Sequence, residues 1–414
     1  MKKYPKYKDS GVSWIGEIPE HWETPKINKL FSIKAGGDAK PDLYTEEKDE
    51  SHPYPVYTNA DSPEAVYGYT SDPYYPKDSI TVTGRGAIGH AIYRNDSPYD
   101  AIIRLLVLQK KGDYICKYFS YFIDTVIPFY SDSAAIAQLS AVQLAKYYAL
   151  LPSKEEQLAI ISYLDRKTSR IDKFIGEAEK EIDLLNELKQ AQIARLVTHG
   201  LNPNVPTKDS GIAWTGEIPE HWDVKRIAML FSENKTKNTD YEFDHAMKFN
   251  YGRLIPKEEK GDVTDLKDTY VAYTKIRKND IAINCLNLNY DFVSQRVAIA
   301  TEDGILTSAY LIISPRDGVN ADYYNYFFKA MDNKKLFHGM GTGIRLTLSY
   351  TELKKQYVVV PPVEEQAAIV SAIETLNTKI DTLTAQLSNQ IEHLKELKQR
   401  IISDAVTGKI DVRN

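Results

Sequence analysis

Apolar residues recur at steps of three and four over two long stretches of the chain, residues 154–196 and 363–405. In the second stretch they form the a/d seam of a coiled coil, with one polar break at Gln390: Ile373, Leu376, Ile380, Leu383, Leu387, Leu394, Leu397 and Ile401. The stripe of the first stretch is broader, which favours a helix that packs on more than one neighbour. Because neither stretch contains a proline, we predict two continuous helices, each roughly 64 Å long at 1.5 Å per residue.

The apolar pattern outside these helices is different. It consists of short runs of β-branched and aromatic residues between Pro, Gly, Asp and Asn, which are typical of strands. Such runs occupy residues 54–58, 79–83, 101–109, 280–285, 296–300 and 308–314. A helix is predicted over 117–127, and both globular parts end in a polar loop, a short helix and a strand that runs into proline. The fold class is therefore α+β.

A repeat organises the chain. KDSGVSWIGEIPEHWE at 8–23 returns as KDSGIAWTGEIPEHWD at 208–223, with 12 of 16 positions identical. EEQLAIIS at 155–162 returns as EEQAAIVS at 364–371. The protein is thus one unit written twice, a globular part followed by a long helix. Two copies of a fold in one chain suggest an internal pseudo-two-fold arrangement.

The repeat markers divide the chain into five parts. Gly200 and Pro203 are stop signals that end the first helix and begin a linker. We predict a first globular domain, a first helix, a linker, a second globular domain, and a second helix with a C-terminal tail: 1–153, 154–196, 197–207, 208–362 and 363–414.

Composition and charge restrict the classes of function. No signal-peptide pattern and no uncharged apolar span of 18 residues is present, so we expect a cytoplasmic protein that neither enters nor crosses a membrane. The net charge of −5 argues weakly against nucleic-acid binding, because a local basic surface suffices. The helical segments are net acidic, so the globular parts would carry such a surface.

The sequence contains no pattern that carries catalysis. GRGAIG at 84–89 matches a dinucleotide-binding fingerprint in letters, but a strand and a turn follow it where a helix is required. Pro41 and Asp42, with the acidic residues 46–47, resemble a nuclease motif at too short a spacing. The histidines and the two cysteines lack metal-ligand spacing. We therefore predict no metal site, no catalytic residue and no enzymatic activity.

Polar loops in both globular parts are the candidate DNA-binding surface. They are rich in Tyr, Asn, Arg, Lys, Ser and Thr, which contact phosphates and base edges. A single loop of this kind is more often solvated surface, but parallel placement in two repeats strengthens the case. The candidates are Tyr57, Asn59, Arg85, His90, Ser133, Gln138, Lys235, Lys237, Asn250, Tyr251, Arg253, Asn287, Asn289, Thr342 and Arg345.

The repeated tryptophans and the residues that begin the long helices form a second group. The motif GEIPEHW in the opening arm of each repeat favours a structural clasp; Glu20 and His21, repeated as Glu220 and His221, could instead suggest acid–base chemistry, but no nucleophile accompanies them. Our candidate partner-binding residues are Trp14, Trp22, Trp214, Trp222, Gln157 and Gln366.

These features resemble the specificity subunits of type I restriction-modification enzymes. The carriers are SGVSWIGEIPEHW and SGIAWTGEIPEHW, with LLPSKEEQ and VVPPVEEQ at the starts of the helices, and the resemblance covers nearly the whole chain. It implies two target-recognition domains, each reading one half of a bipartite site in double-stranded DNA. It also implies that the long helices pair as an antiparallel coiled coil that sets the distance between the halves.

The resemblance further implies a set of partners. Two methyltransferase subunits would bind the chain, and motor-nuclease subunits would bind through them. S-adenosylmethionine, ATP and magnesium would then bind only those partner subunits, and this chain would hold no cofactor. The alternatives are a methylation-only system without a nuclease, a coiled-coil adaptor without DNA specificity, and a self-sufficient restriction enzyme-methyltransferase. The last would need methyltransferase motifs that this sequence lacks.

Overall fold

The chain forms two compact units. The computed structural model describes residues 2–60, 62, 64–129, 138–258, 266–288, 295–343 and 346–413. The first unit is built from residues 1–179 and 388–414, and the second from residues 180–387. Each unit therefore contains one globular part, the beginning of the long helix that follows it, and the end of the other long helix.

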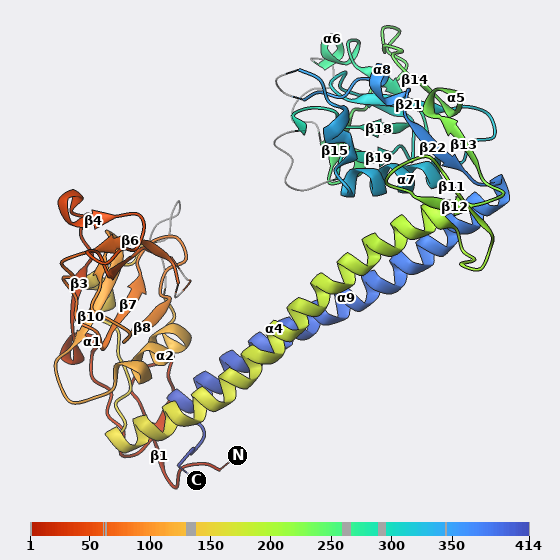
Figure 1. Ribbon diagram of the computed structural model, residues 1–414. Coiled ribbons are helices and arrows are strands. Elements are labelled where there is room, and N and C mark those ends of the chain that lie inside the picture. The colour runs from red at the N-terminus through yellow and green to blue at the C-terminus, as the bar shows by residue number, and fades with distance from the viewer. Residues whose placement is uncertain are drawn as a thin grey trace. The chain divides into compact units, whose positions relative to one another are not determined.

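A four-stranded antiparallel sheet with the order β3-β10-β7-β8 forms the centre of the first unit (Figure 1). In sequence order these strands are Phe31–Ala35, Ser79–Thr83, Ala91–Arg94 and Leu105–Lys110 for β3, β7, β8 and β10. All five residues of β7 are buried, so side chains pack over both faces of the sheet at this central strand. Helix α2 (Cys116–Val126) packs against β7 and β8 and turns an apolar face into the core.

Smaller elements complete this globular part. A second sheet has the order β4-β6-β5-β9, in which β5 and β9 are parallel. Its strands are β4 (Tyr44–Thr45), β5 (Tyr54–Tyr57), β6 (Val66–Thr70) and β9 (Asp100–Ala101). The remaining elements are the hairpin β1 (Tyr7–Asp9) and β2 (Glu17–Pro19), and the short helices α1 (Ile27–Leu30), η1 (Pro41–Leu43) and α3 (Ala141–Leu144).

The second unit repeats this plan with the sheet β14-β21-β18-β19 and helix α7 (Ala321–Asn333) beside β19. Its strands are β14 (Phe231–Glu233), β18 (Ile281–Ile283), β19 (Val297–Ile299) and β21 (Leu311–Pro315). Further strand pairs are β11 (Thr207–Asp209) with β12 (Glu217–Pro219), β15 (Met247–Asn250) with β16 (Arg253–Pro256), and β17 (Thr274–Ile276) with β20 (Gly304–Leu306). The other elements are β13 (Asp223–Arg226) with β22 (Tyr357–Val360), α5 (Ile227–Leu230), α6 (Lys267–Tyr270), η4 (Leu336–Met340) and α8 (Tyr350–Leu353).

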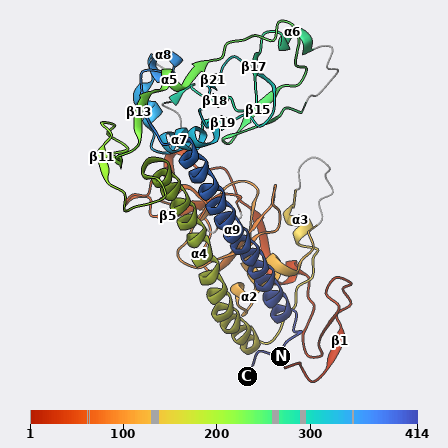
Figure 2. The same cartoon turned by 90° about the vertical axis from the view of Figure 1, so that its right-hand side faces the viewer.

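The long helices α4 (Lys154–His199) and α9 (Val363–Val406) run antiparallel, as Figure 2 also shows. Lys398 pairs with Asp172 at 2.6 Å in the first unit, and Lys189 pairs with Asp381 at 2.7 Å in the second. As the position in α4 rises from 172 to 189, its partner in α9 falls from 398 to 381, which is the signature of antiparallel pairing. The predicted coiled coil is confirmed.

Each unit is closed by the end of the helix from the other repeat. In the first unit, the Tyr118 hydroxyl donates to the Val406 carbonyl at 2.9 Å, near the end of α9. In the second unit, the Tyr323 hydroxyl donates to the Val197 carbonyl at 2.6 Å, near the end of α4. Both tyrosines are fully buried. The last carbonyls of a helix lack partners within the helix, and these phenols satisfy one in each case.

Two expectations differ from the structure. The first long helix continues three residues past 196, to His199, because nothing before Gly200 interrupts it, and Gly200 has the left-handed backbone (φ 72°) typical of a helix end. The strand predicted over 101–109 is two strands, β9 and β10, separated by a turn that contains Arg104. No helix in the described part of the chain is long and apolar enough to cross a membrane.

Candidate DNA-recognition loops

Three polar loops of the first unit meet at one edge of its sheets. The side chain of Asn59, after β5, accepts the Gly84 N–H at 2.8 Å and donates to the Arg85 carbonyl at 2.8 Å. Arg85, after β7, pairs through its backbone with Gln138, and the Leu139 N–H donates to the Gly84 carbonyl at 2.8 Å. The predicted residues Asn59, Arg85 and Gln138 therefore belong to one cluster. Asn59 uses its amide to hold the loops together, while Arg85 is half-buried and Gln138 exposed.

Arg104 belongs to the same cluster and was missed in the sequence. It is exposed, and its carbonyl accepts the Gly84 N–H at 2.9 Å. Its φ of 76° places it in the left-handed region, which ordinary residues seldom adopt outside turns. The only sequence signal was a lone arginine inside an apolar run, which suggested a strand. Arg104 is therefore a candidate for DNA contact, although the apolar run around it predicted only a strand.

Two other predicted residues of the first unit lie in mixed surroundings. The ring of Tyr57 is covered by the Arg94 guanidinium, 3.6 Å from its centroid. His90 is exposed, and its Nδ1 lies 3.5 Å from Asp124 Oδ1. Burial raises the pKa of Asp124 against the opposing hydrogen bonds. His90 is thus available to a ligand, whereas one face of Tyr57 is already occupied.

In the second unit, the predicted residues Asn250, Tyr251 and Arg253 converge on the tip of the β15–β16 hairpin. Asn250 pairs with Arg253, and the two residues between them both have positive φ, 45° at Tyr251 and 71° at Gly252. Positive φ at both central positions defines a type I′ turn, which matches the twist of a hairpin. Tyr251 is 79% exposed, so this tip presents an aromatic ring, an amide and a guanidinium to solvent.

A second cluster lies beyond β18. The Leu288 N–H donates to the Leu346 carbonyl at 3.2 Å, and the Leu348 N–H donates to the Cys285 carbonyl at 3.1 Å. These bonds join the loop that contains Asn287 to the loop that contains Thr342. Both residues are exposed. The Leu348 bond matches the Leu139 bond of the first unit, so the two units hold corresponding loops in the same way.

The Arg296 side chain holds the loop that contains Asn287. It is buried, and its guanidinium donates to the carbonyls of Asn284, Leu286 and Asn287 at 3.0, 2.7 and 3.3 Å. Sequence reasoning missed Arg296 because its partners are backbone carbonyls, which no residue pattern reveals.

Other predicted residues lie elsewhere or outside the described part. Lys235 is paired with Glu233 at 2.9 Å, and the Lys237 ammonium donates to the Ala272 carbonyl at 3.1 Å, so both are already engaged within the chain. The predicted contacts Ser133, Asn289 and Arg345 lie outside the described residues.

The opening arms of the repeats are clasps. The Trp22 indole donates to Glu156 at 3.3 Å, and the His21 ring lies 2.9 Å from the same carboxylate. In the second repeat, the Trp222 indole donates to Glu365 at 3.0 Å. These bonds tie each arm to the first turn of the helix that follows it.

This arrangement corrects the partner-binding assignment of four residues. Trp22 and Trp222 have no exposed surface, and Gln157 and Gln366 are buried and donate to the carbonyls of prolines 152 and 361. A partner therefore cannot reach these side chains. Trp14 and Trp214 are only half-buried. Trp214 packs against Phe327, and Trp14 packs against Phe122 and Tyr147.

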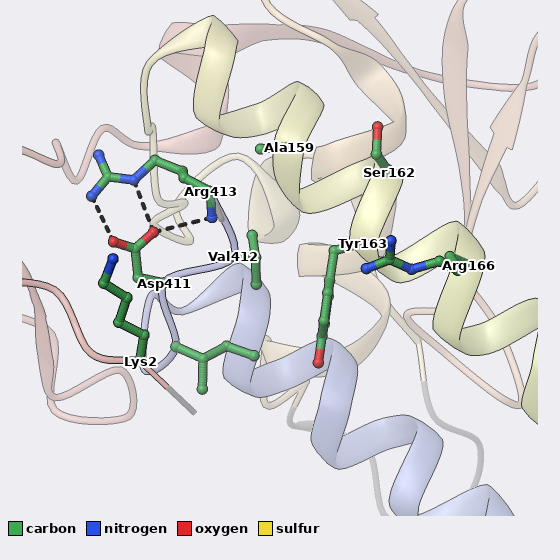
Figure 3. Close-up of a pocket in the computed structure, with 9 residues that line it drawn as sticks. Lys2, Ala159, Ser162, Tyr163, Arg166, Asp411, Val412 and Arg413 are labelled. Atoms are coloured by element: carbon green, nitrogen blue, oxygen red, sulfur yellow. Dashed lines mark hydrogen bonds and ion pairs between the residues drawn. The ribbon is translucent and has the colours of Figure 1, made fainter.

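The cavity in Figure 3 lies apart from the recognition loops. It measures about 420 Å³ and lies in the first unit, between the start of α4 and the C-terminal tail. None of the candidate DNA-binding residues lines it. Its Arg413 forms a two-pronged pair with Asp411, both bonds at 2.8 Å, and the bond from Arg413 lowers the pKa of that carboxyl. Across the described ranges, no group of three or more His, Cys, Asp or Glu could hold a metal ion.

Comparison with known protein families identifies the family to which the chain belongs. The family model described as "Type I restriction modification DNA specificity domain" matches residues 19–183 and 219–393. The chain belongs to this family. The two matches coincide with the two copies of the repeat, each from the end of the opening arm into the long helix.

Individual proteins of this family are similar over much of the chain. The MjaX protein of Methanocaldococcus jannaschii, provisionally named a type I restriction enzyme specificity subunit, is 23% identical over 96% of this chain and 96% of its own length. The type I restriction enzyme EcoBI specificity subunit of Escherichia coli is 24% identical over 68% of this chain and 62% of its own. A chain solved in work on assembly and conformational transition of the type I R-M system has a TM-score of 0.67 at 12% identity, over 95% of this chain and 99% of that one, which shows a shared fold.

Proposed function

We propose that this chain is the DNA sequence-specificity subunit of a type I restriction-modification complex, with each unit reading one half of a bipartite site. The observation that carries the proposal is the matching loop arrangement of the two units. In the first unit, the Leu139 N–H, before α3, donates to the Gly84 carbonyl, after β7, at 2.8 Å. In the second unit, the Leu348 N–H, before α8, donates to the Cys285 carbonyl, after β18, at 3.1 Å. Exposed polar residues of both clusters can reach phosphates and base edges.

We infer that the helix pair holds the two half-sites at a fixed distance and that two methyltransferase subunits bind the chain, with motor-nuclease subunits joining through them. Family membership and the continuous length of α4 and α9 support this inference. S-adenosylmethionine, ATP and magnesium then bind the partner subunits, and this chain contributes no catalytic group. The isolated chain with DNA, methyl donor and magnesium should therefore neither incorporate methyl groups nor cleave.

The test is a domain exchange in the complex with the methyltransferase. Residues 31–150 are replaced by the corresponding segment of a relative, and methylated sites are mapped in the genome. One half of the methylated motif should change while the other half and the spacer stay the same. A change in both halves would contradict independent reading, and a complex without salt-dependent DNA binding would favour the adaptor alternative.

A further inference from the structure

Lys329 in α7 has a partly buried, positively charged side chain to which the fold assigns no structural role. Tyr326 and Asp332 lie three residues before and after it, on the same side of the helix. The Tyr326 hydroxyl accepts a hydrogen bond from Asn377 of α9 at 3.3 Å. Asp332 accepts the backbone N–H of Arg296, just before β19, at 2.7 Å. Lys329 therefore faces the corner between α9 and the beginning of β19.

No acid of the described residues forms an ion pair with Lys329, and the nearby Asp332 carboxylate accepts the Arg296 N–H instead. The Lys329 side chain is partly buried, and within the described ranges its ammonium makes no ion pair and no hydrogen bond. The charges that act on it are Arg253 on β16, Asp332 on its own helix and Lys189 on α4, and Lys189 is itself paired with Asp381 at 2.7 Å. Burial, and after it Arg253, lowers the pKa of Lys329 to about 8. A desolvated lysine beside another cation is costly unless an anion binds there.

Arg253 approaches the same corner from the β15–β16 hairpin. The hairpin turn lies on the beginning of β19, since a Cβ atom on Gly252 would be 3.5 Å from the Val297 carbonyl oxygen. Strands β16 and β19 also pack against each other. Arg253 is exposed, and its side chain likewise makes no ion pair with a described residue. Two cations from separate elements thus flank one point of the surface, next to the exposed hairpin tip.

We propose that Lys329 and Arg253 form a phosphate clamp, which binds one backbone phosphate of the half-site read by the second unit. This inference rests on the proposed function and assigns a positioning role within it. The guanidinium can grip two phosphate oxygens, and the ammonium adds a point charge. Such a contact fixes the register of the protein on the duplex without reading a base.

The first unit lacks this clamp. Its matching position in α2 is Asp124, which accepts the Ala91 N–H at 3.1 Å and lies 3.5 Å from His90. A carboxylate there repels a phosphate. The inference therefore assigns the clamp to one half-site only, and a contact scan should find it on one side of the spacer.

The experiment compares wild type with Lys329→Met in the complete complex with the methyltransferase. The probe is a duplex that carries the site found by methylation mapping, and Lys334→Met, an exposed lysine of the same helix region, is the matched control. We expect Lys329→Met to weaken binding to specific and unrelated duplexes by the same factor. The slope of log affinity against log salt should become less steep, by no more than about 0.9, the value for a whole phosphate contact, because Arg253 still touches that phosphate. Lys334→Met should change neither.

The pH dependence provides a second readout. A phosphate favours the protonated form of Lys329, so the pKa of Lys329 is higher in the DNA-bound complex than in the free protein. The affinity for DNA is therefore highest at pH values below the pKa of Lys329 in the free protein. Above about pH 8, the wild type should lose affinity by up to about tenfold per pH unit until the pKa of the bound state is reached. Lys329→Met should lack this loss. In a scan of duplexes with single neutral methylphosphonates, one position should weaken the wild type more than it weakens Lys329→Met, which keeps only the Arg253 contact there.

The outcomes distinguish a failure of the proposed function from a failure of the phosphate clamp. A wild-type complex without site preference contradicts the proposed function. A wild type with site preference, beside a Lys329→Met variant with unchanged affinity, salt slope and pH dependence, overturns the clamp alone. A variant defective in assembly with the methyltransferase and unchanged on DNA would assign Lys329 to a protein contact, which also overturns it. If Lys329→Met does not fold, Lys329→Gln and the wild-type pH titration decide the question, and a flat titration between pH 7 and 9 overturns the clamp.

Discussion

Replacing Glu156 by alanine should open the clasp of the first repeat. Glu156 lies in the first turn of α4 with a side chain only 4% exposed. It accepts hydrogen bonds from His21 at 2.9 Å, the Trp22 indole at 3.3 Å, and the Ser153 hydroxyl at 3.0 Å. The substitution leaves the Trp22 N–H buried without a partner, and an unsatisfied buried donor costs about 1–3 kcal/mol. Because the His21 side chain is half exposed, its bond to Glu156 is screened and adds little, so we expect a loss of about 2–3 kcal/mol, the upper part of this range.

Two matched variants test the reasoning. Glu365 is the equivalent residue of the second repeat, but its side chain is 25% exposed and it holds only His221 and Trp222. Glu365→Ala should therefore cost less, about 1–2 kcal/mol, the lower part of the same range. Glu155 is exposed in the same turn as Glu156, so Glu155→Ala should cost only about 0.3–1 kcal/mol through the helix dipole.

The assay must resolve the two units, because a chain of this kind need not unfold in one step. Hydrogen exchange followed by mass spectrometry measures local opening free energies at residues 17–25 and 150–160. Glu156→Ala should accelerate exchange in both segments and leave the second repeat unchanged. An opening free energy equal to that of Glu155→Ala would refute the idea that this carboxylate holds the arm.

The same carboxylate predicts a dependence on pH. Burial acts to raise the pKa of Glu156, but the bonds from His21, Trp22 and Ser153 outweigh it and the net shift is downward. A group with a lowered folded-state pKa stabilises the fold above its unfolded pKa, and this contribution is lost as the pH falls through the folded value. The wild type should therefore lose stability below about pH 4.3 more steeply than Glu156→Ala does.

Three further predictions concern the core, the loops and the helices. Tyr118→Phe leaves the Val406 carbonyl without its buried donor and should lower the opening free energy of the first unit by about 1–3 kcal/mol, measured by hydrogen exchange at the end of α9. Asn59→Asp keeps an acceptor for Gly84 but places a carboxylate against the Arg85 carbonyl, so it should alter only the half-site of the first unit in a methylation map. One heptad added to both α4 and α9 keeps the seam in register and lengthens the pair by roughly 10 Å, which corresponds to a spacer about 3 bp longer. Active complex with the original spacer would show that the helices do not set the distance.

The sequence predicted the long helices and the repeat because both depend on patterns that are local or self-comparing. A three-to-four periodicity over some forty residues indicates a helix whatever it packs against, and twelve identities in sixteen positions indicate a duplication. The first helix was predicted to end at residue 196, although Val197, Thr198 and His199 contain no helix breaker. The helix ends at His199, directly before the predicted stop signal Gly200, whose left-handed backbone favours glycine.

The recognition loops were only partly predictable. Tyr251, Asn250 and Arg253 were found because an exposed polar turn between two strands has a local signature. Arg104 was not, because its turn interrupts an apolar run and is held by the Gly84 N–H, twenty residues earlier in the chain. A bond between distant backbone atoms leaves no trace in residue spacing.

The repeated arms are held by tertiary contacts that residue spacing does not reveal. Trp22 and Trp222 find their acceptors 134 and 143 residues away, at the start of the long helix. Each globular part is also capped by the end of the other helix, through Tyr118 in one unit and Tyr323 in the other. A segment exchanged at residues 31–150 therefore has to supply more than recognition loops. It must carry a tyrosine at position 118, because a phenylalanine there would leave a helix carbonyl unsatisfied and confuse a loss of stability with a change of specificity.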